Sequence, residues 1–424
     1  MVSRYIFNSS LKVLTPILRP LMGVATVLCL LMASTATAEP SMCGIAESAL
    51  QEAAKLRALS PRNSVPCVVR SRPEIEVFLR DTIAKKFPKE TLAMEEMWYR
   101  AIGIVPDDYP YEQGIVQAYV QQIGGYYDPE KKQFIMLDTM SRQLRLPVAV
   151  HELTHALQDQ RFGLTDFLDP KEGESDELMA RAALVEGDAN AIMQEFMSGR
   201  SSKTAKGLSE VTLPDSAIKV PETLERILLF PYLDGLTFVR HVERLGGLSA
   251  INAAFSKPPR TSREILHPEQ YVNRSFVPEE LARDQVERPV ELSSPIYEDT
   301  VGEFAVSALL GTALSSRQRG AACAEGLRRD RVVIFKGEAS TRFVSWMSEW
   351  DSQEDTGEFY ECYREMLKVR YQKDVGGELV SVTPTKRMKI ARAGLRISVL
   401  VALDSTDRQT SPSVNQGQAA NVLP

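Results

Sequence analysis

The chain has 424 residues and a formal net charge of −6, with 44% hydrophobic and 25% charged residues. This length allows a large core in one or two lobes. The acidic balance argues against nucleic acid as a partner, because phosphate recognition needs a basic surface.

The first 38 residues have the pattern of a signal peptide. Three basic residues precede a short apolar run over residues 21–32, and Ala36-Thr37-Ala38 offers a small-residue cleavage site. We expect cleavage after Ala38, since the apolar run is short for a membrane span. An uncleaved membrane anchor is the alternative. The mature chain would carry a charge of −9, lie outside the cytoplasm as a secreted or periplasmic protein, and have no stable membrane insertion.

The cysteines fit an oxidising compartment. Four remain after cleavage, and an even number suggests two disulfides, for which three pairings exist. We expect Cys43 with Cys67 and Cys323 with Cys362, because each pair closes a local loop.

The segment before the centre of the chain predicts a mixture of helices and strands. Residues 65–70 have the pattern of a strand, and residues 73–102 that of one or two helices. Two β-prone runs, residues 115–123 and 133–137, are joined by the turn sequence GGYYDPEKK. This arrangement predicts a β-hairpin.

The next motif is HELTH, from His151 to His155. Residues four apart lie on the same face of a helix, so both imidazoles can reach one metal ion, with Glu152 beside them. The chain has only four histidines, which makes a chance match rare. The alternative is an amphipathic helix whose surface carries these side chains without a metal. An apolar stripe anchors the other side of this helix: Leu146, Val150, Leu153 and Leu157.

A catalytic zinc ion usually takes three protein ligands, so a third donor is needed. The helix predicted over residues 176–197 offers Glu186, which has no basic neighbour one turn away. A buried carboxylate without a partner is costly unless a metal supplies one. Gly187 costs about 1 kcal/mol in a helix, which suggests that another backbone passes close by. The alternative is that Glu186 points to solvent.

The rest of the chain is predicted to be mostly helical, with helices near residues 223–245, 263–265, 301–314 and 359–369 and short strands near 378–382, 388–390 and 397–403. The sequence predicts an α+β fold. Residues 39–200 would form an N-terminal lobe and residues 201–403 a mostly helical C-terminal lobe, with a soft boundary near 201–220. Residues 404–424 are expected to be a disordered tail.

The motifs HELTHALQDQRF and ALVEGDANA together resemble the gluzincin clan of zinc metallopeptidases, and most closely a group of secreted bacterial proteins with HExxHALQDQ and EGDA motifs. The segments IGGYYDPEKKQFIML, FPYLDG, TSREILHPEQY and WDSQEDTGEF also resemble that group, so the similarity extends from about residue 56 to residue 403. Arg161 departs from the pattern, where many of the group have histidine. AEGLRRDR, at residues 324–331, is a poor copy of a Gly-rich, Trp-containing segment.

The resemblance implies a mostly helical, zincin-like fold with a small antiparallel sheet beside the active-site helix. It also implies that an edge strand of the hairpin binds the backbone of a peptide or protein substrate, and ordinary sheet is the alternative.

The ligand set predicts hydrolysis by a metal-activated water, with Zn²⁺ held by His151, His155 and Glu186 and with Glu152 as general base. For the oxyanion donor we expect His267, with Tyr271 and Tyr232 as further candidates, although a structural role for His267 is equally open. Asp159 could orient a ligand imidazole. Its alternative is a bond to Arg161 or to a neighbouring loop.

Two functions follow from these residues: an exported zinc peptidase, or a catalytically inactive peptidase-like protein that binds peptides in the cell envelope. A hydrolase of other bonds is a third possibility.

Overall fold

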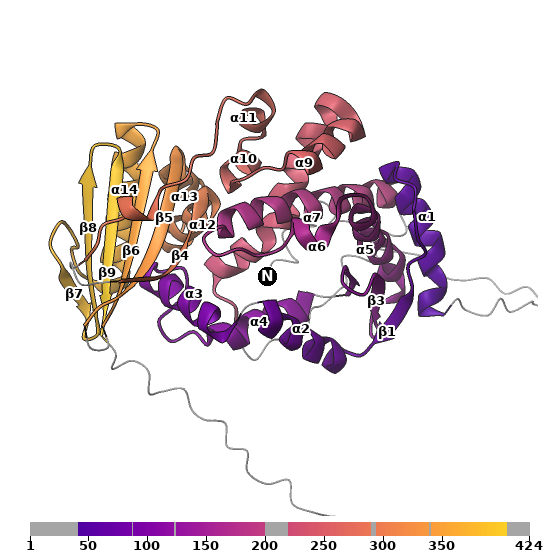
Figure 1. The fold of residues 1–424 in the computed structure, drawn as a ribbon, viewed down its shortest axis with the longest axis horizontal. Helices are drawn as coiled ribbons and strands as arrows, with labels where there is room; N and C mark the ends of the chain where they lie inside the picture. The colour runs from indigo at the N-terminus through magenta and orange to yellow at the C-terminus, as the bar shows by residue number, and fades with distance from the viewer. Residues whose placement is uncertain are drawn as a thin grey trace, which may run out of the picture.

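The computed structural model describes residues 41–86, 88–122, 124–199, 219–289, 294–338 and 341–404, and the fold is α+β (Figure 1). The first half contains η2 (Met42–Ile45), α1 (Ala46–Arg57), β1 (Cys67–Arg70), α2 (Arg72–Lys86), α3 (Lys89–Ile102), α4 (Tyr111–Gln122), β2 (Gly125–Asp128), β3 (Gln133–Leu137), α5 (Arg142–Phe162), α6 (Leu164–Phe167) and α7 (Ser175–Ser198). The second half contains α9 (Glu222–Ser256), α10 (Ser262–Leu266), α11 (Pro268–Asn273), η3 (Arg283–Gln285), β4 (Ser294–Asp299), α12 (Gly302–Ala313), α13 (Arg317–Ala324), β5 (Leu327–Lys336), β6 (Arg342–Trp350), α14 (Gln353–Tyr371), β7 (Val380–Thr383), β8 (Lys386–Ala393) and β9 (Arg396–Leu403).

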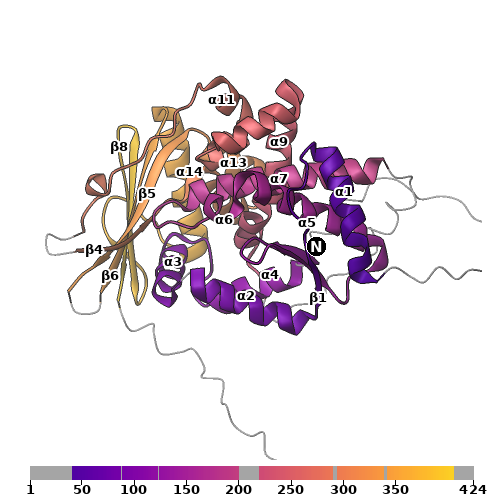
Figure 2. The same ribbon diagram turned by 45° about the vertical axis from the view of Figure 1, so that its right-hand side comes forward.

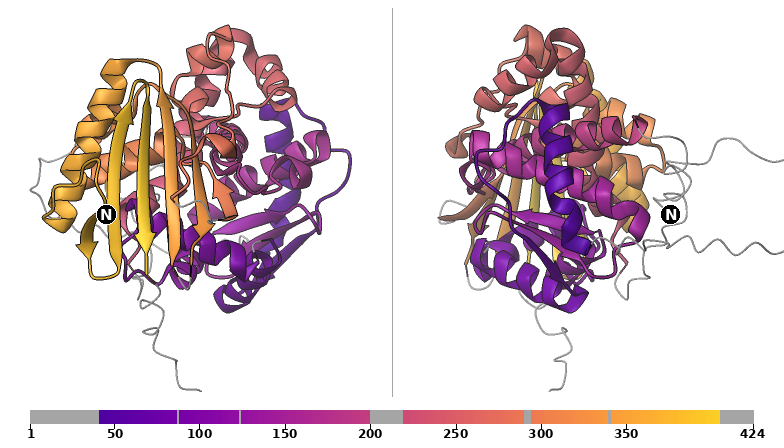
Figure 3. Two further views of the ribbon diagram at one scale, coloured as in Figure 1. Left: turned by 60° about the vertical axis from the view of Figure 1, so that its left-hand side comes forward. Right: turned by 90° about the vertical axis from the view of Figure 1, so that its right-hand side faces the viewer.

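A six-stranded antiparallel sheet forms one end of the molecule, in the order β4-β5-β6-β9-β8-β7 (Figure 3, left). Its apolar face packs against α12 and α14 around Trp346 and Phe359, and α3 joins the same core through Trp98. The three predicted terminal strands are present as β7, β8 and β9. The expectation of a helical C-terminal part with short strands alone is wrong, because β4, β5 and β6 complete a large sheet.

The charged start of β5 explains why the sequence pattern does not predict a strand here. Its first residues are Leu-Arg-Arg-Asp-Arg, a run that is typical of a loop. In the fold Arg329 pairs with Glu349 on the neighbouring strand β6, and Arg331 pairs with Glu298 on β4. These partners come from distant parts of the sequence, so the local pattern could not show that the charges are satisfied inside a sheet.

A second, three-stranded sheet lies beside α5, as expected, in the order β1-β3-β2. It is mixed rather than antiparallel, since β1 runs parallel to β3 and only β2 and β3 form the hairpin. The side chain of Asp128 accepts hydrogen bonds from the amides of Glu130 and Lys131 and so stabilises the hairpin turn.

The prediction of a strand over residues 115–123 is wrong. Most of this segment lies in α4, which begins directly after Pro110 and packs against α2. The first strand of the hairpin is instead Gly125–Asp128, within the sequence read as the turn. Proline before the first helical turn and packing against a neighbouring helix outweigh the β-propensity of the isoleucine, valine and tyrosine residues.

The helices α7 and α9 cross in close contact near the centre of the molecule (Figure 1). A Cβ atom on Gly187 would overlap the carbonyl group of Gly235 and lie 2.8 Å from the amide nitrogen of Leu236. A Cβ atom on Gly235 would in turn overlap the backbone of Ala183. The prediction that another backbone passes close to Gly187 is confirmed.

Both expected disulfides form, Cys43 with Cys67 and Cys323 with Cys362, with Cα atoms 5.5 and 6.3 Å apart. Two disulfides fit a protein that is exported from the cytoplasm. Among the described residues, no helix has the length and apolarity that crossing a membrane requires. The expected signal peptide, most of the expected boundary near residues 201–220, and the tail beyond Asp404 lie outside the described residues.

Candidate metal centre

The HELTH sequence lies in the middle of α5, a helix of 21 residues. α5 is enclosed by α1, α7 and the small sheet (Figures 1 and 2). Val150, Leu153 and Leu157 are fully buried and anchor the helix to its neighbours, as the apolar stripe predicted. Gly163, with a φ of 76°, ends α5 in the left-handed conformation that glycine tolerates.

The structure brings His151, His155 and Glu186 together. The Nε2 atoms of the two histidines are 3.1 Å apart. Oε2 of Glu186, on α7, lies 3.2 Å from Nε2 of His151 and 3.4 Å from Nε2 of His155. Both histidines are buried, and the side chain of Glu186 is 22% exposed. The alternative that Glu186 points away into solvent is therefore wrong.

This donor set fits a divalent cation. Ligands bound tetrahedrally at about 2.0–2.1 Å from zinc are separated from one another by about 3.3 Å, close to the three distances observed here. Within the part of the chain that the structure describes, Nδ1 of His151 is buried without a hydrogen-bond partner, and Oε2 of Glu186 is buried with the two Nε2 atoms close to it. Three atoms with lone pairs facing one point in a buried place repel one another unless a cation or protons lie among them.

The groups around this point strongly affect one another's protonation. Burial lowers the pKa of His155, but the carboxylates of Glu186 and Glu152 outweigh it and raise that pKa to about 9. Burial raises the pKa of Glu186, and the two imidazoles reverse this shift and hold it well below its usual range. Both shifts favour a protonated His155 beside an ionised Glu186, so binding of a cation at this point would release a proton.

Glu152 lies on the same turn of α5 and faces the small sheet. Its Oε2 accepts a hydrogen bond from the backbone amide of Tyr127, on β2, at 3.0 Å. Burial raises the pKa of this carboxyl group, and the neighbouring His151 and His155 oppose the shift in part. A carboxylate held in place with a raised pKa is suited to accept a proton near neutral pH.

Asp159 was a candidate to orient a ligand imidazole, but the residue hydrogen-bonded to His155 is Gln158. Nδ1 of His155 lies 2.8 Å from Oε1 of Gln158. Asp159 instead accepts hydrogen bonds from the hydroxyl of Tyr127, from Nζ of Lys132 and from the amide of Leu164. It joins the hairpin to the first residue of α6, and its bond to Lys132 in the hairpin turn is the bond to a neighbouring loop that was the alternative for it.

His267 is not part of the cluster of His151, His155 and Glu186. It lies at the junction of α10 and α11, directly before Pro268, and its Nε2 is 2.6 Å from Oε1 of the buried Glu303. The hydrogen bond to Glu303 raises the pKa of His267. The neighbouring helix α10 contacts α7 at Asp176, ten residues before Glu186, and ten helical residues span about 15 Å.

The two tyrosine candidates differ in their position. The hydroxyl of Tyr271 donates to the carbonyl of Lys257, at the end of α9, at 2.7 Å. Tyr232 lies on α9, and its carbonyl accepts a hydrogen bond from Asn190 at 3.0 Å, one turn beyond Glu186 on α7. Among the three candidate oxyanion donors, Tyr232 thus has a backbone hydrogen bond to the turn of α7 that follows Glu186.

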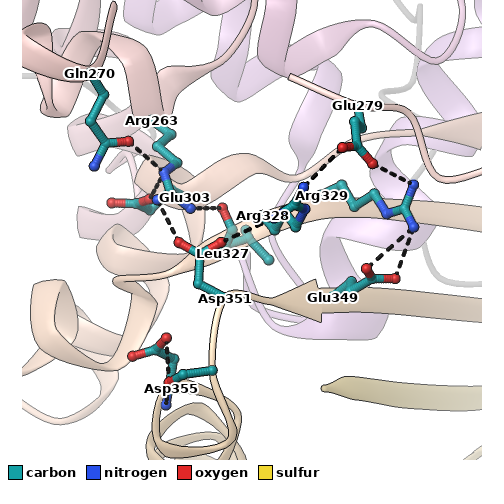
Figure 4. A network of polar contacts seen from close by, with 11 residues as sticks. Arg263, Gln270, Glu279, Glu303, Leu327, Arg328, Arg329, Glu349, Asp351 and Asp355 are labelled. Carbon is teal, nitrogen blue, oxygen red and sulfur yellow. Dashed lines mark hydrogen bonds and ion pairs between the residues drawn. The ribbon is translucent and has the colours of Figure 1, made fainter. Parts of the chain in front are cut away.

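Glu303 belongs to a separate network of charged residues, around a cavity of about 230 Å³ that contains none of the cluster residues. Arg263 lies between Gln270, Asp351 and the carbonyl of Leu327, with Glu303 4.0 Å away (Figure 4). Arg329 pairs with Glu279 and Glu349 in the same network (Figure 4). Both arginines are paired with carboxylates. Because Arg263 belongs to α10 and bonds to Leu327 of β5, the network joins α10 to the large sheet.

The buried carboxyl group of Asp176, at the start of α7, should make the stability of the protein depend on pH. Burial raises its pKa to about 7, although its carboxylate accepts hydrogen bonds from the amide of Ser262. The folded protein therefore holds a proton on Asp176 between about pH 4 and pH 7, where an unfolded chain would release it. Stability from this group is complete below about pH 4 and is lost as the pH rises to about 7, by up to roughly 4 kcal/mol.

We expect Asp176→Asn to reduce the loss of unfolding free energy between pH 4 and pH 8, measured by urea denaturation. Asp81→Asn, at an exposed position of α2, is the matched control and should leave that pH dependence as in the wild type. An unchanged slope in Asp176→Asn would show that Asp176 is ionised in the folded protein throughout this range.

Sequence reasoning missed three residues behind the cluster: Gln158, Asp188 and Arg57. The motifs offered a signal for two of them, because Gln158 is three residues from His155 and Asp188 two residues from Glu186, both within the segments HALQDQ and EGDA. Arg57 had no such signal, since it lies 131 residues before Asp188.

Comparison with known proteins gives one partial match. Residues 291–411 match a family described as Domain of unknown function (DUF8575). The match covers the six-stranded sheet with α12, α13 and α14, and it contains none of the cluster residues. No curated protein and no solved structure matches the chain.

Proposed function

We propose that this chain is an exported zinc-dependent peptidase with a zincin-like arrangement of its two ligand helices. The observation that carries the proposal is the triangle of donor atoms from His151, His155 and Glu186, with separations of 3.1–3.4 Å, beside a carboxylate that is not part of the triangle. The resemblance of HELTHALQDQRF and ALVEGDANA to the gluzincin clan supports it.

His151, His155 and Glu186 would hold Zn²⁺. When bound, zinc would act as a Lewis acid and lower the pKa of a water molecule. Glu152 would accept a proton from that water and later deliver it to the leaving amine. The amide of Tyr127 holds Glu152 toward the sheet during this transfer.

The substrate would lie along β2. The strand order β1-β3-β2 leaves β2 at an edge of the sheet, and β2 is the strand whose backbone bonds to Glu152. An edge strand can pair with an extended peptide through backbone hydrogen bonds. This placement brings a peptide bond near both Glu152 and the three donor atoms. Export through the signal peptide of residues 1–38 agrees with the two disulfides.

The experiment measures zinc content and hydrolysis of an unstructured casein substrate by the mature chain. We expect one zinc ion per chain, and activity that is lost on chelation and restored by zinc. In Glu186→Gln we expect the affinity for zinc to fall by more than roughly 100-fold, which exceeds the loss typical of a residue that only hydrogen-bonds to a metal ligand. Glu195→Gln, exposed on the same helix, is the control and should behave as wild type. Zinc binding that is unaffected by Glu186→Gln would overturn the proposed site.

A further inference from the structure

A chain of buried polar groups leads from His155 to the N-terminal helix. Nε2 of Gln158 donates to Oδ2 of Asp188 at 2.9 Å, and Nε of Arg57 donates to the same oxygen at 2.8 Å. Gln158, Asp188 and Arg57 are each completely buried. Arg57 is the last residue of α1, and its Nη2 donates further to Asn252 of α9. Burying an arginine, a carboxylate and an amide together is costly, and apolar residues would fill the same space more cheaply.

The contacts of Gln158 determine which way its amide points. Its Nε2 has two hydrogen atoms, and these meet two acceptors, the carbonyl of Val185 at 3.1 Å and the carboxylate of Asp188 at 2.9 Å. The reverse orientation would place the amide oxygen against both acceptors. Oε1 therefore faces His155, and Nδ1 of His155 must be the donor.

This orientation fixes the tautomer of His155. A neutral imidazole with its proton on Nδ1 has a lone pair on Nε2, and Nε2 is the atom that faces His151 and Glu186. The charge of Asp188 holds the amide of Gln158, and Arg57 in turn holds Asp188. The acceptors also come from both sides of Glu186, since Val185 precedes it and Asp188 follows two residues later. The same amide thus sets both the ring of His155 and the position of the helix that carries the third donor.

We infer that Gln158 is a positioning residue for a divalent cation, and that α1 completes the metal centre by supplying Arg57 as the support of Asp188. This inference rests on the proposed metal site. It adds to that site a buried connection to α1, which lies along the outside of the molecule (Figure 3, right). α1 follows directly on η2, and the Cys43–Cys67 disulfide joins η2 to β1.

The test compares Zn²⁺ affinity, measured by competition with a chelator, in wild type, Gln158→Leu and Gln158→Met. Both variants keep the approximate volume and remove the hydrogen bonds, and methionine also keeps the unbranched shape. We expect affinity to fall by roughly 10–100-fold in both, the loss typical of an outer partner of a metal ligand. Gln160→Leu is the matched control. Gln160 bonds to Arg62 and Asn63 on the surface, and its loss should leave the affinity within threefold of wild type.

A second measurement separates positioning from a general loss of stability. In ¹⁵N-histidine-labelled, zinc-loaded protein only four histidines contribute signals. We expect a Nδ1 proton of His155 that is protected from exchange in wild type and in Gln160→Leu, and exposed to exchange in Gln158→Leu and Gln158→Met. A merely structural glutamine would lower the unfolding free energy of the zinc-free protein without changing this signal.

The outcomes separate the two proposals. Zinc binding that depends on Glu186 but stays within threefold of wild type in both Gln158 variants overturns the role of Gln158 alone. A wild-type chain that binds no zinc overturns the proposed function, and the inference with it. If Gln158→Leu does not fold, Gln158→Met and the proton signal decide the question.

Discussion

Replacing Glu152 with glutamine is expected to lower casein hydrolysis by roughly 10²–10⁴-fold while zinc is retained, the range over which a general base contributes to catalysis. Glutamine has the same shape and can still accept the hydrogen bond from the amide of Tyr127, so the local structure should be kept. It cannot accept a proton. The measurement is the initial rate of hydrolysis at equal zinc content for wild type, Glu152→Gln and the exposed control Glu195→Gln.

The same experiment distinguishes catalysis from binding alone. If the wild-type chain binds zinc but shows no cleavage that depends on Glu152 across a broad peptide library, the alternative of an inactive peptide-binding protein is supported. Full activity in Glu152→Gln would exclude this residue as the base. Loss of zinc together with activity would show that Glu152 supports the metal site rather than the proton transfer.

Replacing Gly187 with alanine is expected to lower the free energy of unfolding by roughly 3–5 kcal/mol, the upper range for single substitutions. Two effects compete at this position. Alanine favours a helix over glycine by about 1 kcal/mol. The added Cβ atom, however, would overlap the carbonyl group of Gly235, and both groups belong to helix backbones that cannot move alone. The steric effect is larger, so the two helices must separate.

Urea denaturation of the zinc-free protein measures this effect. Gly199→Ala, at the end of the same helix, is the control, because a Cβ atom there would meet its nearest neighbour at an ordinary 3.7 Å. Its stability should remain within about 0.5 kcal/mol of wild type. Equal stability of Gly187→Ala and Gly199→Ala would mean that the crossing of α7 and α9 is looser than the structure indicates.

Features that depend on local spacing could be predicted from the amino-acid sequence alone. A four-residue separation is enough to place His151 and His155 on one face of α5, and helical periodicity is enough to predict α7 with Glu186. Gly187 predicted a close backbone contact because glycine is costly within a helix unless space demands it. The disulfides followed from their short loops.

Features whose partners are far apart in the chain could not be predicted in this way, because they depend on contacts that form on folding. The run at residues 115–123 has β-branched residues but forms α4, because packing against α2 outweighs a weak local preference. The arginines of β5 are stable in a sheet because carboxylates from other parts of the chain reach them: Glu298 and Glu349 from neighbouring strands, and Glu279 from the segment before β4. His267 is hydrogen-bonded to Glu303, whereas Gln158 and Arg57 both donate hydrogen bonds to Asp188. Side chains of this kind receive their roles from contacts made on folding, since the cost of burying a polar group is set by the partner it meets.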